Sequence, residues 1–213
     1  AEPLLAEIVG AVAHTGGHPT VLLSSDAITE SFMREANESI LEWVSPTDVL
    51  IYEQADALIS IRGTTNTRNL SAIDPEKERI TAVARGVLTE TYMRRSADGS
   101  LRWVGTQFPC PAYAQEADMS LSDYQDFVYD AGLLDLEDPV AAWRAEAERQ
   151  QKLIDWLAGR EEIVLMGKDI DLRMSIRGRG FKSAAGKLNF PDGEIYTSPV
   201  EDSVSGWARF AYP

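Results

Sequence analysis

The carboxylate of Glu194 is the side chain of this sequence whose position best suits chemistry. It directly follows a Pro-Asp-Gly turn at residues 191–193 and stands at the beginning of a short β run. A turn of this composition fixes the backbone sharply, so the first side chain after it is held rigidly. Rigid placement is what a metal ligand or a catalytic acid requires. The sequence therefore makes Glu194 the first candidate for a functional carboxylate.

Three more acidic residues lie close to Glu194 in the sequence: Asp192, Glu201 and Asp202. Carboxylate oxygens bind hard and borderline divalent cations, but four acids around two prolines are also typical of a solvated loop. A catalytic metal centre needs three or more protein ligands, and the sequence offers no obvious set. On composition alone the solvated loop is the preferred interpretation, and no catalytic acid, base or nucleophile can be named.

The common catalytic motifs are absent from the sequence. It has no His-Glu-x-x-His helix of the zinc peptidases, no Gly-x-Ser-x-Gly elbow of the serine hydrolases and no glycine-rich phosphate fingerprint. His14 and His18 flank a glycine pair, where a histidine interacts well with the end of a helix. Cys110 lies between two prolines, so we expect a small turn residue rather than a nucleophile.

The charge and composition narrow the possible partners. The 213 residues carry 34 acidic and 20 basic side chains, a net charge of −14. Such a surface repels phosphate backbones, so nucleic acid is not an expected partner. It attracts cations, including metal ions and a free peptide amine, although solubility is the ordinary explanation. The sequence contains no run of about 18 apolar residues, so we expect no membrane span. A single cysteine fits a reducing compartment, so we expect a cytoplasmic protein.

The elements that must position Glu194 follow from the hydrophobic spacing. In the first 158 residues, helices alternate with buried strands, which predicts an α/β fold with a parallel-type sheet and flanking helices. The helical segments are expected at residues 3–15, 28–54, 75–95, 120–129 and 140–157, and the strands, all in one sheet, at 19–24, 57–62 and 101–106. Asp138 is the expected N-cap of the last helix, with Pro139 as its first residue.

The residue pattern changes after Gly159, from one typical of helices to one typical of strands and turns. Residues 162–166 and 169–177 read as two strands joined by a tight turn. We therefore expect an N-terminal α/β domain over residues 1–158 and a β-rich segment over 159–213 that begins a second domain. Residues 208–213 read as a β run without a following partner, which predicts that the chain is a portion of a longer protein.

Three blocks of this sequence resemble one known family. Residues 186–206 read GKLNFPDGEIYTSPVEDSVSG and are similar to the segment around the first metal-binding glutamate of the M29 aminopeptidases. Residues 103–120 read WVGTQFPCPAYAQEADMS, and DFVYDA at 126–131 is followed by DPVAAW at 138–143. The order and spacing of these blocks match the family across nearly the whole chain. The chain corresponds to the N-terminal portion of the family's proteins.

This resemblance implies a metal-dependent aminopeptidase that releases N-terminal residues from peptides. It implies two divalent metal ions per site (cobalt, zinc, manganese or magnesium), a water activated by them, and a homodimer. Glu194 occupies the position of the family's first metal-ligating glutamate. Glu201 is a candidate to contact the side chains that bind the metal, without binding the metal itself. The family's other ligands lie further downstream, so residues 159–213 would begin the catalytic domain and the chain alone would be inactive.

Two alternatives to the aminopeptidase stay open on the sequence. The α/β part could be a non-catalytic scaffold and dimerisation domain. It could also be a plain ligand-binding α/β protein without a metal.

Overall fold

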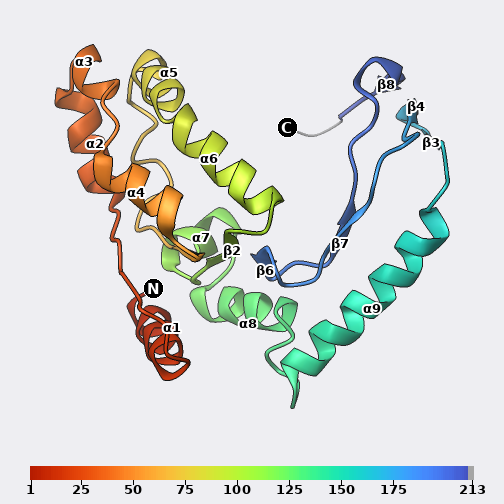
Figure 1. Ribbon diagram of the computed structural model, residues 1–213, viewed down its shortest axis with the longest axis horizontal. Helices are drawn as coiled ribbons and strands as arrows, with labels where there is room; N and C mark the ends of the chain where they lie inside the picture. Colours follow the sequence, from red (N-terminus) through yellow and green to blue (C-terminus); the bar gives the residue numbers. More distant parts are fainter. Residues whose placement is uncertain (211–213) are drawn as a thin grey trace. The chain divides into compact units, whose positions relative to one another are not determined.

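The computed structural model describes residues 1–210 and divides into two compact units, residues 1–129 and the part of the chain from Asp130 onwards. Helices make up most of the first unit (Figure 1). Its elements are α1 (Glu2–His14), α2 (Asp26–Glu35), α3 (Glu38–Leu41), α4 (Pro46–Gln54), β1 (Ala57–Arg62), α5 (Pro75–Ala84), α6 (Gly86–Ala97), β2 (Arg102–Gln107), α7 (Pro111–Glu116) and α8 (Leu121–Ala131), the last of which crosses the division.

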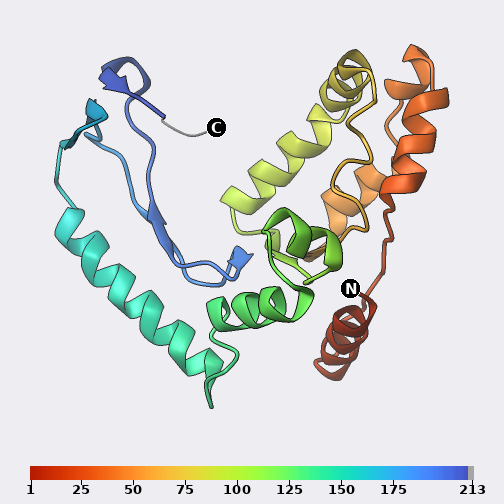
Figure 2. The same cartoon turned by 180° about the vertical axis from the view of Figure 1, so that it is seen from behind.

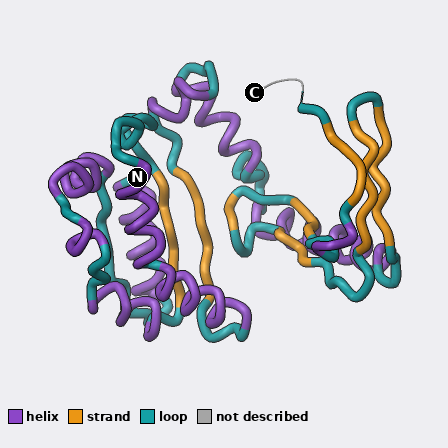
Figure 3. Tube along the Cα trace, turned by 90° about the horizontal axis from the view of Figure 1, so that it is seen from above, coloured by secondary structure: helices purple, strands orange, loops and turns teal. Residues whose placement is uncertain are grey.

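The strands β1 and β2 form the parallel pair of the first unit. They are in register from Ala57 opposite Arg102 to Arg62 opposite Gln107, and Figure 3 shows them side by side with helices next to them. Parallel neighbours need a long crossover connection, which α5 and α6 supply. The expected α/β class, a parallel sheet flanked by helices followed by a strand-rich segment, is confirmed.

The strand expected at residues 19–24 is wrong. This segment adopts no helix or strand, and its apolar side chains are exposed, with Leu23 84% accessible. A strand is stabilised by cross-strand neighbours on its faces rather than by its own composition. The Val-Leu-Leu run has the composition of a strand, but composition alone does not provide a neighbouring strand to pair with.

The single helix expected at residues 75–95 is also wrong, because it is broken in two. Helix α5 ends at Ala84, Arg85 has φ −77° and ψ 0°, and α6 begins at Gly86. Glycine is a poor residue for a helix interior because it loses more conformational freedom than any other residue. The apolar spacing continues through this point, so periodicity alone did not reveal the break.

The second unit combines one long helix with short strands. Its elements are α9 (Pro139–Leu157), β3 (Glu162–Gly167), β4 (Ile170–Ser175), β5 (Lys182–Ala184), β6 (Asn189–Phe190), β7 (Glu194–Tyr196), the 3₁₀ turn η1 (Glu201–Ser203) and β8 (Ser205–Ala208). Strand β4 pairs with β3 on one side and with β8 on the other. Strand β5 pairs with β7.

Helix α9 begins as its sequence predicts. The Asp138 carboxylate accepts a hydrogen bond from the backbone N–H of Ala141 at 2.9 Å, and Pro139 is the first helical residue. This cap satisfies one of the N–H groups that have no partner within the helix. The helix then runs without a break to Leu157, which Figure 2 shows clearly. It is the longest element of the second unit.

The expected boundary at residues 158/159 marks the change from helix to strand rather than the division between the compact units. Helix α9 ends at Leu157 and β3 starts at Glu162, but α9 itself belongs to the second unit. A domain over residues 1–158 stays a prediction. Of the β run expected at 208–213, only Ala208 lies in β8, and 211–213 lie outside the described residues. None of the described helices is long and apolar enough to cross a membrane.

Leu101→Ala should destabilise the first unit by about 2–5 kcal/mol, because Leu101 is only 2% exposed and its truncation leaves a cavity. The matched control is Leu23→Ala, at a position that is 84% exposed, where the change should stay within about 0.5 kcal/mol. The measurement is the free energy of unfolding in urea. Equal values for the two variants would contradict this account of the core.

Candidate functional site

Glu194 lies where the sequence predicts, at the first residue of β7 and directly after the Pro191–Gly193 turn. The turn is fixed by the Asp192 carboxylate, which accepts hydrogen bonds from the backbone N–H groups of Gly193 at 3.0 Å and Asn189 at 3.3 Å. Gly193 has φ +140°, a conformation that favours glycine. These bonds hold the backbone that leads into Glu194.

The Glu194 side chain faces solvent. Along β7, Glu194 and Tyr196 are exposed and Ile195 between them is half-buried. Successive side chains of a strand point to opposite faces, so Glu194 lies on the face opposite to Ile195. An exposed carboxylate on a fixed strand is free to bind a cation.

The backbone of Glu194 is fixed by its pairing with β5. Glu194 is opposite Ala184, and Ile195 is opposite Ser183. Ala184 is 1% exposed, so the β5 side of this pair belongs to the core of the second unit. The pair contains three residues on each strand, which is short for a ladder that has to hold a functional residue.

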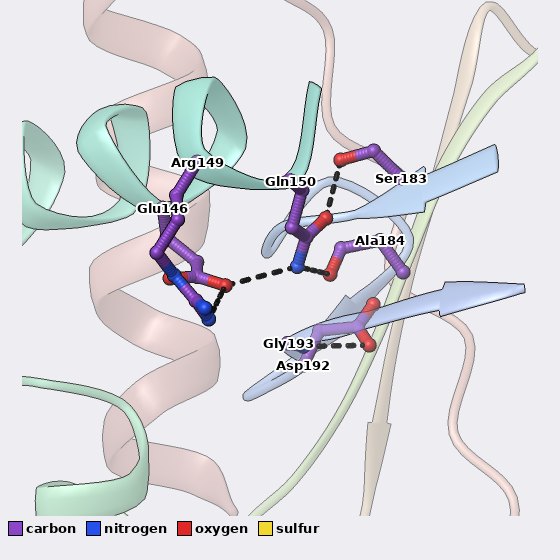
Figure 4. A network of polar contacts seen from close by, with 7 residues as sticks. All are labelled: Glu146, Arg149, Gln150, Ser183, Ala184, Asp192 and Gly193. Atoms are coloured by element: carbon purple, nitrogen blue, oxygen red, sulfur yellow. Dashed lines mark hydrogen bonds and ion pairs between the residues drawn. The ribbon is translucent and has the colours of Figure 1, made fainter. Parts of the chain in front are cut away.

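A buried amide fixes β5 to helix α9. The side chain of Gln150, only 3% exposed, accepts a hydrogen bond from Ser183 Oγ at 2.5 Å and donates one to the Ala184 carbonyl at 3.3 Å. Its Nε2 also donates to Glu146 Oε1 at 3.2 Å. Figure 4 shows the amide between the helix and the strand with these three bonds.

Glu201 lies in the 3₁₀ turn η1, where its carboxylate has a partner of its own. The Arg179 guanidinium donates to Glu201 Oε2 at 2.8 Å, and the Glu201 side chain is 83% exposed. A hydrogen bond from its own backbone N–H, followed by the charge of Arg179, lowers the pKa of Glu201. The observed partner is therefore an arginine, and the role of Glu201 beside metal-bound groups stays a prediction.

The described residues do not complete a metal centre. Within residues 1–210, no three His, Cys, Asp or Glu side chains come together closely enough to hold an ion. Catalytic metal sites in proteins normally have at least three protein ligands. Glu194 fits a metal as one oxygen ligand, and this part of the chain does not supply the rest of the coordination sphere.

The first unit contains a cleft that was not predicted from the sequence. Its volume is about 550 Å³. It is lined by the segment after β1, by one end of α2, by α5 and by α7, with Asp26, Thr64, Arg68, Glu78 and Tyr113 among its residues. The signal was available, because segments that follow parallel strands are where open α/β sheets bind ligands.

Gln150 was missed as well. It lies seven residues after Trp143 on α9, two helical turns along the same face. Trp143 packs against Phe190 with ring centroids 5.8 Å apart and donates Nε1–H to the Gly132 carbonyl at 2.8 Å. A glutamine on the face of a helix that carries a packed tryptophan is the signal that could have identified it.

Comparisons with known proteins agree on one group. The family model described as thermophilic metalloprotease (M29) matches residues 1–213. Aminopeptidase 2 of Geobacillus stearothermophilus is 26% identical over 180 residues, which cover 76% of this chain and 43% of that protein. The structure of wild-type AmpT from Thermus thermophilus has the same fold, with a TM-score of 0.76 at 18% identity, over 97% of this chain and 56% of that one. The chain thus spans about half the length of the relatives that it matches.

Arg179→Met should raise the pKa of Glu201 but leave it below the ordinary value of 4.5, because the backbone N–H still stabilises the carboxylate. A lowered folded-state pKa stabilises the fold above the unfolded-state pKa, and this stabilisation is lost as the pH falls through the folded value. The variant should therefore lose less stability on acidification. NMR titration of the Glu201 side chain measures the shift.

The matched control is Arg177→Met, which removes a different arginine, one paired with Glu161 at 2.8 Å. It should leave the pKa of Glu201 unchanged. If both variants shift Glu201 equally, general surface charge rather than the Arg179 contact lowers its pKa.

Proposed function

The chain belongs to the M29 family of thermophilic metalloproteases, and we propose that it is part of a metal-dependent aminopeptidase that releases N-terminal residues from peptides. The observation that carries this proposal is the family match over the whole chain, which includes the turn that presents Glu194. The likeness to Aminopeptidase 2 supports the exopeptidase class.

In this proposal Glu194 supplies one metal ligand. Its carboxylate is exposed, is fixed by the turn and by β5, and has the donor chemistry that divalent ions prefer. The remaining ligands come from protein outside residues 1–210, in keeping with the incomplete set within them. Two bound ions would supply an activated water for attack on the peptide carbonyl. Cobalt, zinc, manganese and magnesium all remain candidates.

The electrostatics of the chain suit a peptide with a free amine. A net charge of −14 raises the local concentration of cationic ligands, and an N-terminal ammonium is one. A homodimer, which rests on the family alone, and a cytoplasmic location, which the single cysteine also favours, are further parts of the proposal.

One alternative has an observation in its favour. A non-catalytic scaffold or dimerisation role for the α/β part agrees with the lack of a complete ligand set in residues 1–210. It predicts that replacing the Glu194 carboxylate leaves the activity of the intact protein unchanged, whereas the aminopeptidase proposal predicts loss.

Residues 1–213 purified alone should release no N-terminal leucine from a leucyl amide. The reason is that one glutamate does not hold catalytic ions without further ligands. The assay is run with and without added cobalt, zinc or manganese, on protein shown to be folded by circular dichroism. Chelator-sensitive release by this chain would contradict the prediction.

Glu194→Gln in the intact enzyme should abolish turnover and remove or misplace at least one metal ion. The amide keeps the size of the side chain and loses the charge that binds the cation. Asp192→Asn should be milder, because the single amide oxygen of an asparagine can still accept one of the two turn hydrogen bonds. Kinetics at saturating metal and metal counting on each variant provide the test.

The matched control for this test is Glu162→Gln, which changes another exposed glutamate at the first residue of a strand. It should retain wild-type rate and metal content. If Glu194→Gln behaves like this control, Glu194 is not a ligand. Circular dichroism of each variant verifies that the fold is retained.

A further inference from the structure

We propose that Gln150 is the positioning residue for Glu194: its buried amide fixes β5, and β5 fixes the strand that presents the Glu194 carboxylate. The inference rests on the proposed function, because it gives Gln150 a role in metal binding. It concerns residues of the second unit alone.

The amide of Gln150 is buried and its hydrogen-bonding capacity is used at both ends. It is 3% exposed, Oε1 accepts from Ser183, and the two Nε2–H groups have Ala184 and Glu146 as acceptors. A buried polar group that loses its partners incurs the full cost of desolvation. The side chain is therefore held in one orientation, and β5 is held with it.

The amide contacts two consecutive residues of β5 in different ways. It accepts from the hydroxyl of Ser183 and donates to the backbone carbonyl of Ala184. A shift of β5 by one residue would put an alanine or a lysine side chain where the hydroxyl now lies. Gln150 thus selects one axial position of β5 along α9.

The register of β5 determines the face on which Glu194 lies. Ala184, whose carbonyl accepts from Gln150, is directly opposite Glu194 in the antiparallel pair. A slip of one residue moves every side chain of a strand to the other face. With three residues on each strand, the ladder alone gives little resistance to such a slip. The hydrogen bonds between Gln150 and β5 add resistance to it.

On α9, the Gln150 side chain is itself held by a neighbouring residue. Glu146 Oε1 accepts from both Gln150 and Arg149, the latter at 2.7 Å (Figure 4). The hydrogen bond from Arg149 lowers the pKa of Glu146, so this acceptor is ionised at neutral pH. The carboxylate keeps the Gln150 amide in the orientation that places Oε1 towards Ser183.

The test uses the intact enzyme and Co²⁺ alone as the probe, with its visible absorption spectrum as the readout. Gln150→Met keeps the length of the side chain and removes the amide, and it should weaken Co²⁺ binding about 10–100-fold, the range typical for residues that orient metal ligands. The control is Gln151→Met on the next residue of α9, which is exposed and donates to Asp155 at 2.8 Å. It should bind Co²⁺ as the wild type does.

A second pair of variants tests the same contact from the strand. Ser183→Ala removes the donor to Gln150 Oε1 and should weaken Co²⁺ binding, while Ser183→Thr keeps a hydroxyl and should retain it. If Gln150→Met fails to fold, this pair decides the question. The double variant Gln150→Met/Ser183→Ala should bind no more weakly than Gln150→Met, because both changes break one contact.

The variant Asp138→Ala distinguishes the positioning role of Gln150 from a purely structural role. It removes the cap of α9 and leaves β5 unchanged. It should lower the unfolding temperature and leave Co²⁺ affinity unchanged. Wild-type affinity in Gln150→Met or Ser183→Ala, or an affinity loss in Asp138→Ala equal to theirs, overturns the inference. Glu194→Gln separates this result from failure of the proposed function. If it too binds Co²⁺ normally, Glu194 is not a ligand. If it loses Co²⁺ while Gln150→Met does not, only the role of Gln150 is wrong.

Discussion

The buried hydrogen bonds between Gln150 and β5 are the constraint on which the presentation of Glu194 depends. A two-stranded ladder of three residues per strand is marginal in water. Packing one of its strands against a long capped helix gives it a fixed reference, and a fully paired amide makes that packing specific. The strand that carries the exposed carboxylate is therefore held next to α9 both through its pairing with β5 and through its own contacts with that helix.

In this arrangement, the residues that fix the backbone differ from the residue that would bind the metal. The groups that fix the backbone are buried or internally paired: Gln150 in the core and Asp192 in its turn. Glu194 itself is exposed and sits on the outward face of β7. A metal ligand needs both properties, since the ion must reach the oxygen while the oxygen stays in place. Glu201 differs, because its carboxylate forms an ion pair with Arg179.

The sequence predicted those features whose causes are local. The turn before Glu194 follows from Pro-Asp-Gly, and the start of α9 follows from Asp138 and Pro139. It failed where the cause lies elsewhere in the chain. Residues 19–24 have strand composition but not the neighbour that a strand needs. The hydrogen bond that Gln150 accepts comes from Ser183, 33 residues away, and no three His, Cys, Asp or Glu side chains come together within residues 1–210.

The most direct measurement is a crystal structure of the intact enzyme grown with Zn²⁺, with the ion located by its anomalous scattering. We expect a zinc ion about 2.0–2.2 Å from a carboxylate oxygen of Glu194, with Gln150 still hydrogen-bonded to Ser183. A fully coordinated catalytic zinc ion whose ligands do not include Glu194 would contradict it.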